Sequence, residues 1–184
     1  MNVLDYWSGE IIRSHKNWKE KGWVETLQEL TRKTIHSITC YDPLCIKGDI
    51  TIWDTPGDTF HYTSNVGNIM ERAFDAMCLF NPNPICAVGR QLWLGESWFQ
   101  HGRYLSIAAY LIQDCLVPGG DIFVQFDDEM DQWDSWRGRE IFLEKLQAYT
   151  DDGIIPVQEW GTEAGQKFQN DNYCFCSLHH FRKK

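Results

Sequence analysis

The stretch LIQDCLVPGGDIFVQFDDE, residues 111–129, decides the fold class of this chain. An apolar, helix-like run ends at Val117-Pro118-Gly119-Gly120, a strand-like run follows it, and acidic residues come after the strand. Proline cannot continue a helix and glycine readily ends one, so we predict a buried helix over residues 104–116 and a central strand over 121–126. A helix that leads directly into a buried strand is typical of an α/β sheet.

The rest of the chain alternates between helical and strand patterns in the same way. The N-terminal segment, residues 1–34, has an apolar helical face that is interrupted near Gly22, and we expect it to pack on the sheet. Further strands are predicted at 35–41, 49–53, 85–88, 154–160 and 173–179, and further helices at 65–77 and 135–149. This order predicts a single α/β domain over residues 1–184. It is a three-layer sandwich with a mostly parallel sheet and a C-terminal antiparallel edge hairpin.

The composition is that of a folded, soluble protein, with 43% hydrophobic and 23% charged residues. A net charge of −9 argues against general nucleic-acid binding, because phosphate affinity comes from clustered Lys and Arg. The chain has no signal-like or membrane-spanning apolar run, so we expect a cytoplasmic protein without membrane contact. Seven irregularly spaced Cys fit reduced thiols. Nine Trp serve either the core or an exposed binding surface, and the sequence leaves both open.

The segment from Tyr104 to His180 resembles the C-terminal half of the S-adenosylmethionine-dependent methyltransferase fold, and residues 116–124, LVPGGDIFV, carry the resemblance. It implies a Rossmann-like fold with a nucleoside-type cofactor. That family binds its cofactor with a glycine-rich turn after the first strand, and residues 35–60 contain no such turn. The nearest substitute, residues 87–95, has too few glycines and the wrong place in the order. The sequence therefore favours a related or degenerate Rossmann-like fold over an active methyltransferase, and the cofactor stays unassigned.

A second resemblance involves the run His61-Tyr62-Thr63-Ser64-Asn65-Val66 with Met70 after it. This run is similar to a Tyr-Thr-Ser-Asn-Val motif in uncharacterised bacteriophage-encoded proteins. The resemblance implies a phage or mobile-element origin and carries no chemistry with it. Physically, Thr63-Ser64-Asn65 is a good helix start, because side-chain oxygens accept the free amide hydrogens of the first turn. The same amides can instead hold a phosphate or carboxylate, with His61 and Tyr62 as further donors.

Acidic residues follow two of the predicted strands, and open α/β sheets place their sites at the carboxyl ends of strands. We therefore predict one rim that joins the loop 54–58, the helix start and the acidic turn 127–131. Asp54 and His61 are its candidate catalytic acid or base. Its candidate ligand-binding residues are Asp58, Tyr62, Ser64, Asn65, Asp127 and Asp128. A solvated acidic turn is the alternative for residues 127–131, because clustered like charges avoid burial.

Two other kinds of site are excluded. Asp54-Thr55-Pro56-Gly57 is similar to the Asp-x-x-Gly element of GTPases, but the chain has no Gly-x4-Gly-Lys-Ser/Thr phosphate loop. Cys174, Cys176, His179 and His180 suggest zinc at first sight. On a strand, however, the two Cys and His179 point to opposite faces, and a second Cys pair is missing. We therefore predict no metal site.

Two functional hypotheses from different classes remain open. The first is a small-molecule site for a nucleotide, a nucleoside or an S-adenosylmethionine-like ligand, in a divergent transferase of phage or mobile-element origin. The second is a non-enzymatic, acidic phage accessory or immunity-type protein that binds and inhibits a basic protein partner through acidic charge and exposed Trp.

Overall fold

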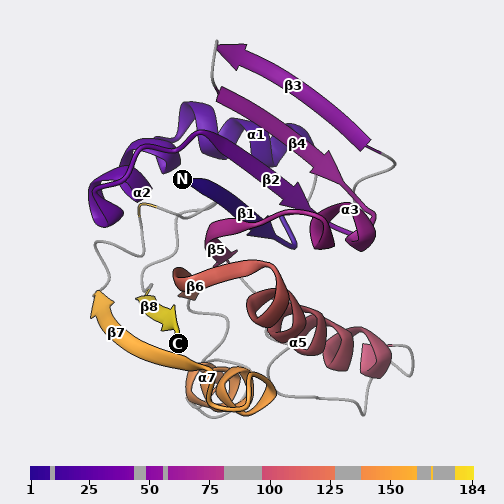
Figure 1. Cartoon of the computed structure of the whole chain (residues 1–184), viewed down its shortest axis with the longest axis vertical. Coiled ribbons are helices and arrows are strands. Elements are labelled where there is room, and N and C mark those ends of the chain that lie inside the picture. Colours follow the sequence, from indigo (N-terminus) through magenta and orange to yellow (C-terminus); the bar gives the residue numbers. More distant parts are fainter. Residues whose placement is uncertain are drawn as a thin grey trace.

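The computed structural model describes residues 1–8, 11–43, 49–55, 58–80, 97–126, 138–160, 167 and 177–184. Its strands are β1 (Asn2–Tyr6), β2 (Ser37–Tyr41), β3 (Asp49–Thr55), β4 (Asp58–Thr63), β5 (Phe74–Phe80), β6 (Leu116–Phe126), β7 (Ile154–Trp160) and β8 (Ser177–Lys183). Its helices are α1 (Ile11–Glu20), α2 (Trp23–Thr31), α3 (Val66–Met70), α5 (Ser97–Asp114) and α7 (Gly138–Tyr149). Within the described ranges the strands form one eight-stranded sheet in the order β3-β4-β2-β1-β5-β6-β8-β7 (Figure 1).

The sheet is mostly parallel, with antiparallel pairs at its two ends. Strands β4, β2, β1, β5 and β6 run parallel to one another, whereas β3 pairs antiparallel with β4. At the other end β8 pairs antiparallel with β6, and β7 pairs antiparallel with β8. The predicted fold class and its C-terminal edge hairpin are therefore confirmed.

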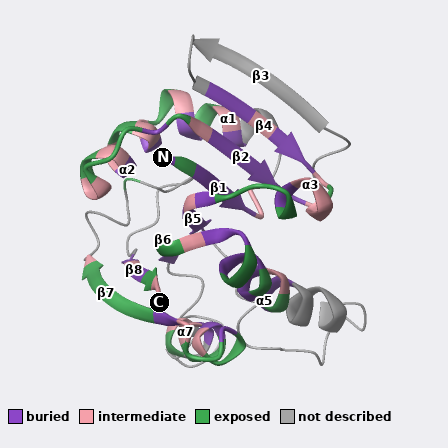
Figure 2. Cartoon of the chain, viewed as in Figure 1, coloured by how far each residue is buried: buried purple, intermediate pink, exposed green. Residues whose placement is uncertain are grey.

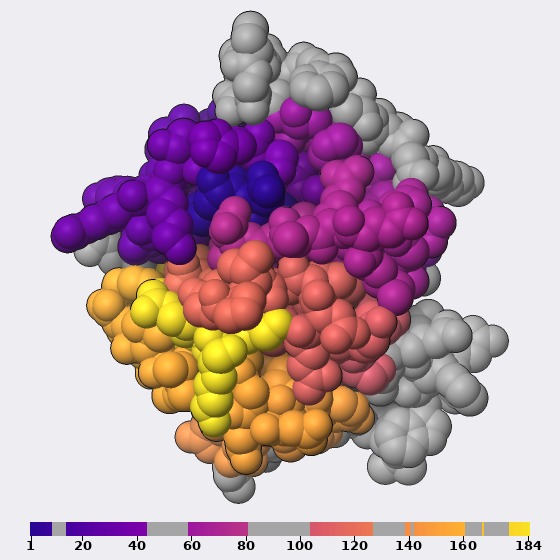
Figure 3. Space-filling view, in the orientation of Figure 1, coloured from indigo at the N-terminus to yellow at the C-terminus, as the bar shows by residue number. Residues whose placement is uncertain are grey.

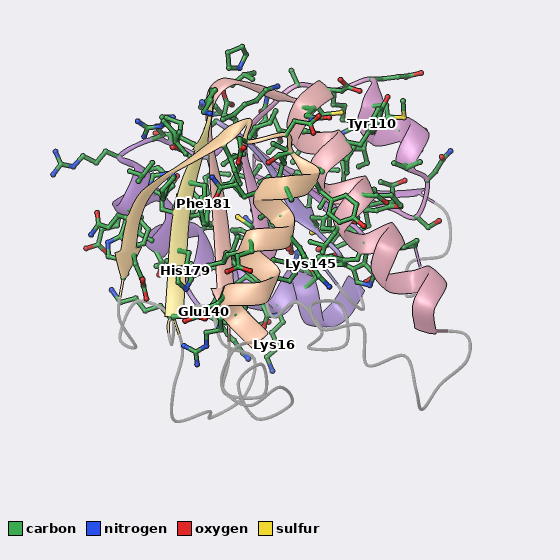
Figure 4. The ribbon with its side chains drawn as sticks, turned by 90° about the horizontal axis from the view of Figure 1, so that it is seen from below. Lys16, Tyr110, Glu140, Lys145, His179 and Phe181 are labelled. Carbon is green, nitrogen blue, oxygen red and sulfur yellow. The ribbon has the colours of Figure 1, made fainter. Side chains whose placement is uncertain are left out.

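Each face of the sheet has its own hydrophobic core. Trp18, Trp23 and Leu27 of α1 and α2 pack in one core, and Leu111 and Phe142 of α5 and α7 pack in the other. Figure 2 shows buried residues along the central strands, and Figure 4 shows α5 and α7 side by side on one face. The molecule is therefore the predicted three-layer sandwich, and these two Trp belong to its core.

The Pro-Gly-Gly segment forms a large bulge at the start of β6. Phe74 pairs with Leu116, but Ala76 pairs with Asp121, so residues 117–120 stand against one residue of β5. Gly119 has a left-handed φ of 74°, which favours glycine. A Cβ on Gly120 would lie 2.7 Å from the Leu116 side chain, so this position also excludes larger residues. Helix α5 begins earlier than the predicted helix 104–116, and the predicted strand 121–126 is the part of β6 after the bulge.

The amino end of β6 is held by an ion-pair network around the buried Asp121. Its carboxylate lies 3.1 Å from Lys33 Nζ, 2.9 Å from His180 Nε2 and 3.1 Å from Arg182 Nη2. Burial alone raises the pKa of a carboxyl, but hydrogen bonds from His180, Lys33 and Arg182 lower that of Asp121 to about 2. The network joins the end of α2 to β6 and β8. Figure 3 shows the C-terminal residues, in yellow, lying against the chain around β6.

Two predicted elements in the N-terminal half are wrong or shifted. Residues 2–6 are not helical, because they form β1 in the middle of the sheet. The predicted helix 65–77 ends at Met70, and β5 begins at Phe74. Strand β4 was not predicted. Residues 173–176 of the predicted strand 173–179 lie outside the described residues, and β8 covers Ser177–Lys183. Short, fully buried parallel strands read as continuous apolar runs, and periodicity cannot distinguish such runs from buried helix. The predicted strand 85–88 lies outside the described residues.

Candidate functional site

The order of the parallel strands reverses between β1 and β5. From β1 the chain adds β2 and then β4 on one side, and it adds β5 and then β6 on the other. Open α/β sheets bind ligands outside the carboxyl ends of their strands at this reversal point. The carboxyl edge, at which β1, β2, β4, β5 and β6 end, is therefore the place for a ligand (Figure 1).

The turn after β1 has the backbone shape that glycine usually provides, but Trp occupies it. Trp7 has a left-handed φ of 61°, which is costly for a residue with a Cβ. Its indole ring offsets this cost by packing 5.0 Å from the ring of Tyr104 and 5.7 Å from that of Tyr6. The next amide, of Ser8, donates to the Tyr41 carbonyl at 3.0 Å and fastens the turn to β2.

The turn at Trp7, and not a turn within residues 35–60, follows the first strand of the sheet. The sequence pattern predicts the first strand at 35–41, whereas the first strand is residues 2–6. The segment after it reads Trp7-Ser8-Gly9-Glu10, so one glycine is present at the place where a glycine-rich turn would be. Gly9 and Glu10 themselves lie outside the described residues.

A buried carboxylate follows β2, directly beside this turn. Asp42 is 1% exposed, and its amide donates to the Thr63 carbonyl at 3.2 Å. Rossmann-like sites use an acidic residue near the end of the second strand to accept hydrogen bonds from ribose hydroxyls. Sequence reasoning missed Asp42, although its place after the strand-like run 35–41 was a usable signal.

A second buried carboxylate, Asp5 of β1, lies behind the turn and faces α1. Its Oδ2 accepts hydrogen bonds from Trp18 Nε1 at 2.7 Å, Ser14 Oγ at 3.3 Å and Cys40 Sγ at 3.8 Å. Burial raises the pKa of Asp5 to about 6, although these three donors lower it, and the nearby Asp42 raises it further. All three donors are neutral groups, so their hydrogen bonds do not fully offset the lost hydration of the Asp5 carboxylate.

The predicted helix start is at the carboxyl edge, and its polar groups cap α3. Asn65 Oδ1 accepts from the amide of Gly67 at 2.9 Å, and the amide of Asn65 donates to Thr63 Oγ1 at 3.1 Å. Ser64 lies between them and is half-buried. Asn65 is therefore the helix cap of α3. Thr63–Asn65 lie beside Asp42 at the carboxyl edge, because the amide of Asp42 donates to the Thr63 carbonyl.

His61 and Tyr62 lie within β4 rather than at its end. Tyr62 is buried in the core under α1 and α2, so His61 points to the opposite face. Burial lowers the pKa of the half-buried His61, and the nearby Arg72 lowers it further. Arg72 Nη1 also donates to Thr39 Oγ1 at 3.3 Å. The structure does not bring His61 and Tyr62 together at one site.

The described residues that were predicted to share one rim lie at two opposite edges of the sheet. Asp58 begins β4 and pairs with Thr55 of β3, so both Asp54 and Asp58 lie at the amino edge of the parallel strands. Five residue steps separate Asp58 from Thr63, which is about 17 Å along a strand. Grouping Asp54 and Asp58 with the carboxyl edge is therefore wrong, because β4 was not recognised as a strand. Asp127 and Asp128 lie outside the described residues, immediately after β6.

Comparisons with known proteins bear on the fold. No protein-family model and no curated protein matches the chain. Among solved structures, the aminoglycoside resistance methyltransferase NpmB1 matches 100% of this chain and 87% of its own, at 16% identity and a TM-score of 0.52. A candidate hemolysin from Streptococcus thermophilus matches 100% of this chain and 59% of its own, at 11% identity and a TM-score of 0.51. The N-methyltransferase NodS from Bradyrhizobium japonicum matches 99% and 85%, at 11% identity and a TM-score of 0.48.

The chain has the same Rossmann-like fold as NpmB1. Two features of its carboxyl edge match those that Rossmann-like folds use to bind a nucleoside. The turn at Trp7 has the left-handed shape required after the first strand, and Asp42 offers a carboxylate beside it. Within the described ranges, no group of three or more His, Cys, Asp or Glu side chains is arranged for a metal ion. In the same ranges, no helix has the length and apolar character needed to cross a membrane.

Proposed function

We propose that this chain binds S-adenosylmethionine at the carboxyl edge of its sheet and acts as a methyltransferase. The observation that supports this most is the reversal of strand order between β1 and β5, with the buried Asp42 at the end of the strand next to β1. Rossmann-like sites use an acidic residue near the end of the second strand to accept hydrogen bonds from ribose hydroxyls, and Asp42 occupies the corresponding place after β2.

In this proposal each segment of the edge has a defined role. Asp42 accepts the ribose hydroxyls, and the turn at Trp7 and Ser8 lets the backbone approach the rest of the cofactor. Thr63–Asn65, which follows the neighbouring strand β4, borders the base. The cofactor supplies an activated methyl group when it is bound. The acceptor is unassigned, because residues 81–96 and 127–137 next to β5 and β6 lie outside the described residues.

Calorimetric titration with S-adenosylhomocysteine, adenosine and ATP tests the proposal. We expect S-adenosylhomocysteine to bind, and Asp42→Asn to weaken it at least tenfold, since a hydrogen bond to a charged group contributes about 1.5–3 kcal/mol. Asp152→Asn is the matched control. It removes an exposed carboxylate from a turn after α7, and its left-handed φ of 55° is one that Asn tolerates.

Two results would oppose the proposal. The first is that neither S-adenosylhomocysteine nor adenosine binds to a protein whose melting curve shows that it is folded. This would mean that the carboxyl edge is not a nucleoside site. Binding of ATP without S-adenosylhomocysteine would keep a nucleotide site and reject a methyltransferase. The hypotheses of a phage origin and of an inhibitory protein partner remain predictions, because the acidic turn 127–131 on which the second depends lies outside the described residues.

A further inference from the structure

A serine, a histidine and a glutamate lie together where β7, β8 and the start of α7 meet. Ser177 and His179 are two residues apart on β8, so their side chains point to the same face of the sheet. Glu159 of β7 is the register partner of His179. The hydroxyl oxygen of Ser177 lies 3.1 Å from His179 Nε2, and His179 Nδ1 lies 3.9 Å from a carboxylate oxygen of Glu159. The imidazole therefore stands between a hydroxyl and a carboxylate.

The imidazole of His179 is held in place by aromatic packing on the α7 face of the sheet. Its ring meets the ring of Phe126 edge-on, with the ring centres 5.4 Å apart. Phe126 packs in turn against Phe142 of α7, and Figure 4 shows His179 on β8 beside this helix. The His179 side chain is 12% exposed, whereas that of Glu159 is 68% exposed. The group is therefore packed on the side of α7 and reaches solvent at its carboxylate.

The surroundings of His179 make its Nε2 a proton acceptor towards Ser177. Burial lowers the pKa of His179, and although the nearby Glu159 raises it, Arg139 lowers it again, so the net direction is downward. The imidazole is therefore mainly neutral at pH 7 and carries one N–H. The carboxylate beside Nδ1 favours the proton on that nitrogen, so the lone pair of Nε2 faces the Ser177 hydroxyl.

A cation approaches the same hydroxyl oxygen from the first turn of α7. Arg139 Nη1 donates to Ser177 Oγ at 3.1 Å. The oxygen therefore accepts from Arg139, and its own hydrogen can be donated to His179 Nε2. A guanidinium at this distance also favours negative charge on the oxygen as its proton leaves. Ser177 thus has a base on one side and a stabilising cation on the other.

We propose that Ser177, His179 and Glu159 form a nucleophilic site that takes an acyl group from a small ester. A nucleophile within hydrogen-bond reach of a base, with the base oriented by a third group, is the arrangement that activates a serine, and its distances are often longer without substrate. Ser177 is 5% exposed, so we expect a small ester to reach it. This activity goes beyond the proposed methyltransferase function and does not depend on it.

The reaction has two steps, and His179 carries the proton in both. First, Ser177 Oγ bonds to the carbonyl carbon of the ester while its proton passes to His179 Nε2. The ester's alkoxide leaves with that proton as the alcohol. Water then attacks the acyl-serine and gives its proton to the same nitrogen. The free acid is released, and the proton returns to the Ser177 oxygen.

Covalent labelling of the full chain with diisopropyl fluorophosphate tests the proposal, because this reagent bonds its phosphorus to an activated serine oxygen and releases fluoride. Mass spectrometry of the digested protein locates the label, and release of p-nitrophenol from p-nitrophenyl acetate measures acyl transfer. We expect the label on Ser177 and no label at this position in Ser177→Ala. In His179→Gln both rates should fall by about a hundredfold, which is the lower end of the range for a general base.

Glu159 is a positioning residue in this proposal, and its effect is smaller. We expect Glu159→Gln to slow labelling by up to about fivefold, the range of an exposed ion pair. Glu159→Asp should keep the wild-type rate, because it retains the negative charge. Ser106→Ala and His36→Gln are the matched controls, since Ser106 is an exposed serine of α5 and His36 an exposed histidine before β2. Both should label at the wild-type rate.

Three outcomes would overturn the proposal. The first is no label on Ser177 in the folded wild-type chain, a result that no variant is needed to obtain. The second is equal release of p-nitrophenol by the wild type and by Ser177→Ala, which would place the reaction at other side chains. The third is an unchanged labelling rate in His179→Gln, which would show that Ser177 reacts without this base. Melting curves establish that each variant is folded. Titration of S-adenosylhomocysteine reports on the cofactor site separately, and we expect it to be unchanged by Ser177→Ala.

Discussion

Replacing Asp5 by Asn should stabilise the protein at neutral pH. Burial raises the pKa of this carboxyl from 3.8 to about 6. A difference of 2.2 pKa units corresponds to about 3 kcal/mol, at 1.36 kcal/mol for each unit. Because the folded state binds the proton more tightly than the unfolded state, the stability that Asp5 contributes is fully present below pH 4. It is lost as the pH rises from about 4 to about 6.

Urea denaturation of the wild type and of Asp5→Asn between pH 4 and pH 7.5 measures this difference. Asn keeps an oxygen that accepts from Trp18 Nε1, so we expect similar stability at pH 4. The variant should gain up to about 3 kcal/mol by pH 7, with most of the change between pH 4 and pH 6. A variant that is less stable than the wild type by the same amount at every pH would refute the reasoning. It would mean that Asp5 is ionised in the fold and that its charge is needed by its three donors.

Three further changes test other parts of the structure. Asp121→Asn should cost about 2 kcal/mol at pH 7, because its pKa is lowered from 3.8 to about 2. That loss should fade as the pH falls from about 4 towards 2, which chemical denaturation across this range measures. Leu111→Ala should cost about 2–5 kcal/mol in urea denaturation, because Leu111 is fully buried in α5. Lys183→Met should lower the melting temperature, since Lys183 Nζ donates to the carbonyls of Gln113 and Leu116 at the end of α5.

The fold of the C-terminal half could be predicted because its signals are long and locally unambiguous. Helix α5 has apolar residues around most of its surface, and Pro118 and Gly119 mark the place where a helix cannot continue. Strands β7 and β8 are separated from α7 by a turn with left-handed residues at Asp151 and Asp152. Each of these features depends on neighbours in the sequence, and a single chain displays them directly.

The N-terminal half was harder because its strands are short and buried on both faces. β1 contributes Val3 to one core and Leu4 to the other, so it lacks the alternation of polar and apolar residues that marks a half-exposed strand. β5, from Phe74 to Phe80, is almost wholly apolar for the same reason. Each of these two runs adjoins a segment with a helical pattern, and no local signal distinguishes the strand from a continuation of the helix. Whether such a run forms a strand or a helix depends on how the strands pair in the folded chain. Local sequence patterns do not report that pairing.

The candidate site was only partly predictable, since strand direction decides which loops share an edge. Thr63–Asn65 lie at the carboxyl end of β4, and the acidic residues 127–131, which follow β6 in the sequence, lie outside the described residues. Asp54 was assigned to the carboxyl edge too, but β3 runs antiparallel to β4, so its carboxyl end is at the opposite edge. Strand direction follows from tertiary pairing, which local patterns do not report. Asp42 is a single acidic residue rather than part of a cluster of carboxylates, and a single one is what the Rossmann-like position requires.

The two buried carboxylates at opposite edges of the sheet show which edge is arranged for function. Asp121 is surrounded by Lys33, His180 and Arg182, so its charge is compensated and contributes to stability. Asp5 has neutral donors and lies near another buried carboxylate, Asp42, so its ionisation costs stability. Groups held at such a cost are concentrated at active and binding sites, where folding stability is exchanged for chemistry. The carboxylate whose ionisation is stabilised by neighbouring cations therefore lies at the amino edge, and the one whose ionisation is opposed by burial lies near the carboxyl edge.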